Sequence, residues 1–149
     1  MATHPGDRAP DFELSDQDGK PYRLSEQKGQ RLLLVFYPGD NTPVCTAQLC
    51  DYRDGLEDFE GLDVTVVGIS SDGPSSHQAF RKKHDLPFTL LSDANLEVAR
   101  KYDCKALIGM KRAVFLIDEN QKIRYRHIES MAVFRRHREE LIEAIRQLG

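Results

Sequence analysis

The stretch Arg31-Leu-Leu-Leu-Val-Phe-Tyr37, followed at once by Pro38-Gly39, decides the fold class of this chain. An unbroken apolar run of this length is typical of a strand that is covered on both faces, as in a parallel sheet. Two further runs have the same character, Asp63-Val-Thr-Val-Val-Gly-Ile69 and Arg112-Ala-Val-Phe-Leu-Ile117. The sequence therefore predicts buried strands at these three places.

The segments around these runs complete the predicted topology. Residues Ile123 to Ile128 alternate in polarity and follow the third run closely, which predicts an antiparallel hairpin at one side of the sheet. Apolar residues spaced by three or four predict helices. The predicted helices are Pro43 to about Glu60, Pro74 to His84, Ala94 to Tyr102 behind an Asp93 cap, and about Val133 to Leu148. Strands that alternate with helices predict an α/β fold, a central mixed sheet flanked by helices and joined by right-handed crossovers.

Length and composition favour an ordinary globular protein. A chain of 149 residues is enough for one domain, and we expect residues 1–149 to form it. A net charge of −3 gives no general case for nucleic acid or an anionic membrane as partner. The apolar run Leu32 to Tyr37 is far shorter than the roughly 20 residues that span a bilayer. The start of the chain lacks the pattern of a signal peptide, so we expect a cytoplasmic protein.

The three cysteines do not predict a disulfide scaffold in a reducing cytosol. Each is then a small buried hydrophobe, a metal ligand or a redox centre. The histidines show no ligand spacing with each other or with the cysteines, which argues against zinc. These histidines are His4, His77, His84, His127 and His137. A hydrolase with a distant Cys–His pair is conceivable, although nothing in the local sequence supports it.

Cys45 lies where a helix is predicted to begin. Thr42 is a suitable N-cap residue, Pro43 has the favoured first helical position, and Cys45 is the third residue. Unpaired N–H groups and the positive end of the helix dipole favour an anion in this turn, so they favour the nucleophilic thiolate. The Thr42 hydroxyl lies on the same side of the turn and can reach the sulfur or a substrate oxygen. Taken alone, Cys45 also fits a residue that simply fills the inward stripe of the helix.

Cys50 follows Cys45 by five residues, so the pair does not have the Cys-x-x-Cys spacing of thioredoxins and zinc sites. Five helical residues give about 140° of rotation and about 7.5 Å of rise, hence a Cα separation of roughly 8.7 Å. A disulfide requires less than about 7 Å. The two cysteines can pair only if the first turns of the helix unwind, which favours a transient catalytic disulfide over a structural one.

The stretch Pro38-Gly-Asp-Asn-Thr-Pro-Val-Cys-Thr-Ala-Gln-Leu-Cys50 resembles the active-site motif of peroxiredoxins, Pro-x-x-x-Thr/Ser-x-x-Cys. The cysteine five residues later is similar to that of the bacterioferritin comigratory protein subfamily, also called peroxiredoxin Q. The opening Gly6 to Phe12 resembles the usual first segment of the family. The stretch Gly109 to Asp118 resembles the strand that bears the active-site arginine of the family. The likeness extends over nearly the whole chain.

This resemblance implies a thioredoxin-like fold and the reduction of hydrogen peroxide and organic hydroperoxides without metal or organic cofactor. By position, Cys45 would be the peroxidatic cysteine and Thr42 would hydrogen-bond the substrate. Arg112 would stabilise the thiolate and the departing oxygen, and its guanidinium is a permanent positive charge. Pro38 would shield the site from water. Gln48 matches a Glu or Gln that is common three residues after the peroxidatic cysteine.

The resemblance further implies that Cys50 resolves the oxidised Cys45, and that thioredoxin, or alternatively glutaredoxin, reduces the disulfide. It favours a monomer, or at most a weak dimer. Cys104 matches no motif position, so we expect a structural or incidental role and keep it as an alternative resolving thiol. Two other function classes stay open: a disulfide-exchange protein, which Pro38 and Thr42 disfavour, and an α/β module without activity.

Overall fold

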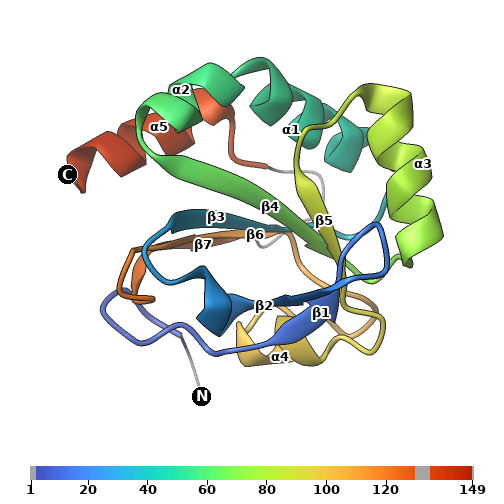
Figure 1. Cartoon of the computed structure of the whole chain (residues 1–149), viewed down its shortest axis with the longest axis horizontal. Coiled ribbons are helices and arrows are strands. Elements are labelled where there is room, and N and C mark those ends of the chain that lie inside the picture. Colours follow the sequence, from blue (N-terminus) through green and yellow to red (C-terminus); the bar gives the residue numbers. More distant parts are fainter. Residues whose placement is uncertain (1–2, 130–134, 149) are drawn as a thin grey trace.

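The computed structural model describes residues 3–129 and 135–148, which form one seven-stranded sheet with helices on both faces (Figure 1). The strands are β1 (Glu13–Ser15), β2 (Pro21–Arg23), β3 (Arg31–Phe36), β4 (Val64–Ser70), β5 (Thr89–Ser92), β6 (Ala113–Ile117) and β7 (Ile123–Ile128). The helices are the 3-10 turn η1 (Leu24–Gln27) and the α-helices α1 (Pro43–Asp54), α2 (Leu56–Gly61), α3 (Pro74–His84), α4 (Glu97–Lys101) and α5 (Arg138–Gln147). The strand order is β2-β1-β5-β4-β3-β6-β7.

The three predicted apolar runs form the centre of this sheet. Strand β3 pairs in parallel with β4 and antiparallel with β6, so the sheet is mixed as predicted. The parallel pairing continues from β4 to β5. Strands β6 and β7 form the predicted antiparallel hairpin, and β7 is the edge strand.

Alternate side chains of β3 enter two separate cores, one on each face of the sheet. Leu33, Val35 and Tyr37 pack with side chains from α1, α2, α3 and α5. Leu32, Leu34 and Phe36 pack with the N-terminal segment and α4. Figure 1 shows α1, α2 and α5 above the sheet and α4 below it. This burial on both faces explains why the β3 sequence is apolar without alternation.

The prediction of one helix from Pro43 to Glu60 is wrong, because the chain forms α1 and α2 with a break at Gly55. Gly55 is the C-cap of α1 and its amide bonds to the carbonyl of Asp51. A Cβ built at Gly55 would lie 2.6 Å from Cδ of Arg138, so the glycine lets α5 approach closely. Glycine is common where helices end, and here it also leaves room for the Arg138 side chain.

The other helices differ from their predictions mainly at their ends. Helix α3 has the predicted bounds. Helix α4 begins three residues late, yet the Asp93 carboxylate accepts hydrogen bonds from the amides of Val98 and Ala99, as a cap would. Residues 133 and 134 of the last predicted helix lie outside the described residues, and α5 begins at Arg138. Within the described ranges, no helix combines the length and apolar character needed to cross a membrane.

Candidate functional site

The candidate site lies where the parallel strands β3, β4 and β5 reach their carboxyl ends, a common location for active sites in α/β folds. The loop after β3 carries residues 38–42 and leads into α1. Thr42 is the N-cap residue of α1, with extended backbone angles of φ −82° and ψ 146°, and Pro43 is the first helical residue. The amide of Thr46 donates to the carbonyl of Thr42 at 2.9 Å, which closes the first turn. The predicted helix start is therefore confirmed.

Cys45 and Arg112 meet in the interior of the protein. The side chain of Cys45 is fully buried in the first turn of α1, and Arg112, directly before β6, is 3% exposed. Nη1 of Arg112 lies 3.0 Å from Sγ of Cys45, within hydrogen-bond distance for sulfur. A guanidinium in this position adds a permanent positive charge to the favourable field of the helix start. The structure thus brings together the two residues that the sequence paired.

Gln48 and Tyr52 extend this contact along α1. The same Nη1 of Arg112 donates to Oε1 of Gln48 at 2.8 Å. The side-chain Nε2 of Gln48 donates to the Tyr52 hydroxyl at 3.0 Å, and that hydroxyl donates to the backbone carbonyl of Arg136 at 2.6 Å. Burial raises the pKa of Tyr52, so its hydroxyl stays protonated and remains a donor. This series of hydrogen bonds fixes the orientation of the guanidinium against the sulfur.

Thr42 and Pro38 lie on the loop in front of the buried cysteine. The Thr42 hydroxyl donates to the carbonyl of Gly39 at 3.0 Å, and Thr42 makes no side-chain cap bond to the helix. Its predicted position at the N-cap is correct, but its expected cap interaction is missing because the hydroxyl turns back to the loop. Thr42 is exposed and Pro38 is half-buried. Both residues therefore lie on the loop that leads into the helix start with Cys45.

Cys50 lies on the same uninterrupted helix as Cys45, as predicted. It is half-buried and packs against the same core, and both thiols are free. Since α1 is continuous from residue 43 to 54, the helix estimate of roughly 8.7 Å between their Cα atoms applies. A disulfide between them requires α1 to unwind.

Cys104 lies on the opposite face of the sheet. It is fully buried in the core that contains Phe36 and Tyr102, whereas Cys45 belongs to the core of the other face. Burial, together with the nearby carboxylates of Asp93 and Asp103, raises the pKa of the Cys104 thiol. A protonated thiol in an apolar core fits the structural role expected for Cys104.

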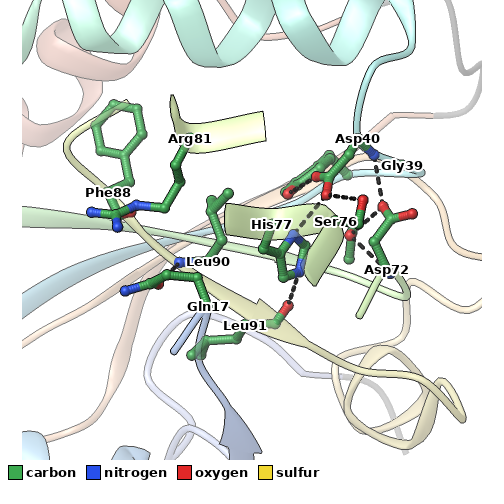
Figure 2. Close-up of polar contacts among 12 residues, drawn as sticks. Gln17, Gly39, Asp40, Asp72, Ser76, His77, Arg81, Phe88, Leu90 and Leu91 are labelled. Carbon is green, nitrogen blue, oxygen red and sulfur yellow. Dashed lines mark hydrogen bonds and ion pairs between the residues drawn. The ribbon is translucent and has the colours of Figure 1, made fainter. Parts of the chain in front are cut away.

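Asp40 and His77 form a buried pair beside the site that the sequence did not reveal. Their side chains meet at 2.8 Å between Oδ2 and Nδ1 (Figure 2). Asp40 lies inside the predicted active-site loop, but His77 showed no spacing relative to any other candidate residue. Only the packing of α3 against the loop brings the two together. Among residues 3–129 and 135–148, no group of three or more potential ligand side chains could hold a metal ion.

Known proteins are similar to this chain in sequence and in fold. Residues 5–126 match the AhpC/TSA family. Peroxiredoxin Bcp of Bacillus subtilis is 39% identical over 131 residues, which are 83% of this chain and 83% of that protein. The chloroplastic peroxiredoxin Q of Populus jackii is 43% identical over 136 residues, 83% of this chain and 64% of that protein. The crystal structure of peroxidoxin BcpB from Mycobacterium tuberculosis superimposes with a TM-score of 0.85 at 32% identity, over 98% of this chain and 96% of that one.

These similarities confirm the predicted thioredoxin-like fold, since the neighbour covers almost every residue of both chains. They confirm the oxidoreductase class as well, because the matching relatives are peroxiredoxins over most of their shared length. The chain therefore belongs to the AhpC/TSA family, as a peroxiredoxin of the Bcp and peroxiredoxin Q type that acts as a thiol peroxidase.

Proposed function

We propose that this peroxidase reduces hydrogen peroxide and organic hydroperoxides with Cys45 as its peroxidatic cysteine, Cys50 as its resolving cysteine and thioredoxin as its reductant. The observation that carries the proposal is the distance of 3.0 Å between Nη1 of Arg112 and Sγ of Cys45. Arginine keeps its charge at every physiological pH, so this contact favours the thiolate, which is the nucleophilic form.

In the first step, the Cys45 thiolate attacks the terminal oxygen of the hydroperoxide and the O–O bond breaks. The sulfur loses two electrons and becomes a sulfenic acid, while the leaving oxygen gains them, takes up a proton and departs as water or an alcohol. Negative charge spreads over three atoms in this transition state. Arg112 and the Thr42 hydroxyl are donors that can stabilise it, and Pro38 limits the access of water.

Thr42 supports this step by its position. Thr42 is exposed and lies three residues before the buried cysteine. The acceptor of the Thr42 hydroxyl is the carbonyl of Gly39 in its own loop. A substrate oxygen can replace this acceptor with little rearrangement, because a hydroxyl rotates freely about its C–O bond.

In the second step, the Cys50 thiol attacks the sulfur of the sulfenic acid. A disulfide forms and water leaves, and two thiols of an external dithiol then reduce the disulfide by exchange. The roughly 8.7 Å helical separation exceeds the limit of about 7 Å, so α1 must unwind between the two steps. Half-burial of Cys50 supports this role, since a partly exposed thiol is accessible to both partners.

An exposed apolar turn precedes Arg112 in the sequence and bears on the substrate range. Residues 105 and 110 form a bridge, and between them Leu107 and Ile108 are almost fully exposed at the tip of a turn. An exposed apolar pair on the segment that leads to Arg112 supports the use of organic hydroperoxides as well as hydrogen peroxide.

The remaining expectations also stay predictions. We infer that residues 1–149 form one domain, which is supported by the match of residues 5–126 to a single family. A monomer is proposed on the resemblance to the peroxiredoxin Q subfamily. A cytoplasmic location also stays a proposal, and the Populus jackii relative is named as chloroplastic.

One titration tests the proposed function. Reduced protein receives one equivalent of hydrogen peroxide, its free thiols are counted before and after, and the new disulfide is mapped by mass spectrometry. We expect the loss of two thiols and a Cys45–Cys50 bridge, with no turnover in Cys45→Ser. Cys104→Ala is the matched control and should behave as the unmodified chain. Substantial turnover in Cys45→Ser would falsify the role of Cys45, and a bridge that includes Cys104 would replace Cys50 as the resolving thiol.

A further inference from the structure

A buried carboxylate lies in the middle of the active-site loop. The side chain of Asp40, between Pro38 and Thr42, is 1% exposed, and the side chain of its partner His77 is 0% exposed. Nδ1 of His77 lies 2.8 Å from Oδ2 of Asp40. Figure 2 shows the two side chains pointing toward one another, His77 from α3 and Asp40 from the loop. Two titratable side chains are removed from water here without any part in the chemistry described above.

Three side chains donate to this carboxylate. Besides His77, the Tyr37 hydroxyl lies 2.6 Å from Oδ1, and the Ser76 hydroxyl lies 2.8 Å from Oδ2. Burial alone would raise the pKa of Asp40, but hydrogen bonds from His77, Tyr37 and Ser76 hold it below its ordinary value. Asp40 is therefore ionised at neutral pH, with its charge fully surrounded by donors.

His77 has an oxygen within hydrogen-bond distance of each ring nitrogen. Its Nδ1 faces the Asp40 carboxylate, and its Nε2 lies 3.0 Å from the carbonyl oxygen of Leu91. The imidazole therefore joins the loop to α3 and to β5.

The backbone of the loop is held from a second side. The amide of Asp40 donates to Oδ2 of Asp72 at 2.7 Å, and the Ser70 hydroxyl donates to the same oxygen at 2.8 Å. Gly68 lets the Tyr37 ring lie close to β4, since a Cβ there would come within 3.1 Å of the ring. The loop is thus fixed to the ends of β4, β5 and α3, whereas α1, which follows it, has to unwind in the proposed cycle.

We propose that the buried Asp40–His77 pair is a positioning device for the peroxidase reaction. It holds residues 38–42 in place, so that the first turn of α1 presents Cys45 to Arg112 and the substrate. It also stays formed while α1 unwinds, so the helix forms again from the same start after reduction. This inference rests on the proposed function of Cys45. Because the pair stays formed while α1 unwinds, it affects the rate of Cys45 oxidation and not the rate of disulfide formation.

The test compares Asp40→Asn, His77→Gln and the double variant. The rate constant for oxidation of Cys45 is measured in a single turnover by quenching with an alkylating reagent, and disulfide formation is followed in the same samples. We expect each single variant to slow oxidation about tenfold or more, because small displacements of reacting groups have large effects on rate. Disulfide formation should stay within about twofold of the unmodified chain. The double variant should be no slower than the slower single one, since the two residues act as one unit.

Controls separate positioning from general loss of stability. Ile123→Val, a buried change on the opposite face of the sheet, should lower the stability to urea but leave the oxidation rate unchanged. If His77→Gln or Asp40→Asn does not fold, Ser76→Ala and Tyr37→Phe each remove one donor to Asp40 without removing a charge. Both should still slow oxidation severalfold while disulfide formation is preserved.

Oxidation at the unmodified rate in every folded variant would overturn the inference. Effects that multiply in the double variant would overturn it as well, because independent residues behave in that way. Either result would leave the peroxidase activity of the unmodified chain intact. Failure of the proposed function would instead appear in the unmodified chain, as an absence of Cys45 oxidation by peroxide.

Discussion

Asp51 accepts a hydrogen bond from the backbone amide of Arg138 at 3.0 Å, which joins α1 to the first residue of α5. The same carboxylate oxygen lies 3.1 Å from Nη1 of Arg135. A carboxylate at the start of a helix is stabilised by the unpaired amides and by the helix dipole. Asp51 directly follows Cys50, so this contact holds the part of α1 that must unwind before a disulfide forms.

We therefore predict that Asp51→Asn accelerates disulfide formation after oxidation, by about threefold to tenfold, because an amide keeps the shape but loses the charge. The free energy of unfolding should fall by about 1.5–3 kcal/mol, the usual range for a hydrogen bond to a charged group. Rapid quenching and mass spectrometry of the alkylated protein measure the first quantity, and urea unfolding measures the second.

Asp54→Asn is the matched control for this prediction. Asp54 ends the same helix, but its side chain is 59% exposed and pairs only with its neighbour Arg53 among the contacts of the described residues. Exposed pairs of this kind contribute little, so both measurements should stay unchanged. If Asp51→Asn forms the disulfide no faster than Asp54→Asn, the contact with Arg138 does not limit unwinding.

Arg112→Ala should slow the oxidation of Cys45 by about 100-fold, the usual cost of losing a fixed donor to a developing charge. Alkylation of Cys45 should also need a higher pH for the same rate, because the thiolate loses its positive neighbour. Arg112→Lys should recover only part of both effects, since an ammonium lacks the fixed planar fork of the guanidinium. An unchanged pH profile in Arg112→Ala would mean that the helix start alone activates the thiol.

The central strands could be predicted from the sequence because burial on both faces leaves a continuous apolar run, as in β3. Strands β1, β2 and β5 could not, since they have three or four residues each and are partly exposed. The break at Gly55 was missed for a different reason. The apolar spacing of three and four continues across Gly55, so the pattern did not show that this glycine ends α1.

The residues of the candidate site also divide into those that a local motif predicts and those that only the fold brings together. Cys45, Thr42 and Pro38 share one loop and helix start, so a local motif was enough to predict their grouping, and the resemblance added Arg112. The Asp40–His77 pair joins residues that are 37 positions apart. Neither has a recognisable spacing, and their contact exists only because α3 packs beside the loop after β3. Buried polar pairs of this kind become visible once the topology is known.

Asp40 should also make the stability of the protein sensitive to acid. Its pKa is lowered in the folded state, so the stability that it contributes is complete above its unfolded value of about 3.9 and is lost as the pH falls through the lower folded value. Asp40→Asn should therefore lower the free energy of unfolding most above about pH 5. The difference in this free energy between the variant and the unmodified chain should narrow as the pH falls toward about 2. Urea unfolding across this range, followed by circular dichroism, measures the difference. A difference in the free energy of unfolding that stays constant across this pH range would show that ionisation of Asp40 does not stabilise the fold.

Cys50→Ser should separate the two chemical steps. The variant should still reduce one equivalent of peroxide per chain, because Cys45 and Arg112 are unchanged. It should then stop as the sulfenic acid, become open to further oxidation, and lose most of its thioredoxin-dependent turnover. Mass spectrometry of the oxidised variant identifies the sulfenic and sulfinic forms. Full turnover in Cys50→Ser would assign resolution to another thiol, and the additional change Cys104→Ala would show whether Cys104 supplies it.

The oxidised protein should have lost the first turns of α1. The helix is continuous from Pro43 to Asp54 in the present structure, and its geometry keeps the two sulfur-bearing residues too far apart for a disulfide. We therefore expect faster amide hydrogen exchange over residues 43–52 in the oxidised protein than in the reduced one, while residues 64–70 of β4 keep their protection as an internal control. Residues 38–42 should also keep their protection from exchange, because Asp40 stays bound to His77 and Asp72. Equal protection of α1 in both states would mean that Cys45 and Cys50 do not form the disulfide. Loss of protection that begins before residue 43 would mean that the loop moves together with the helix.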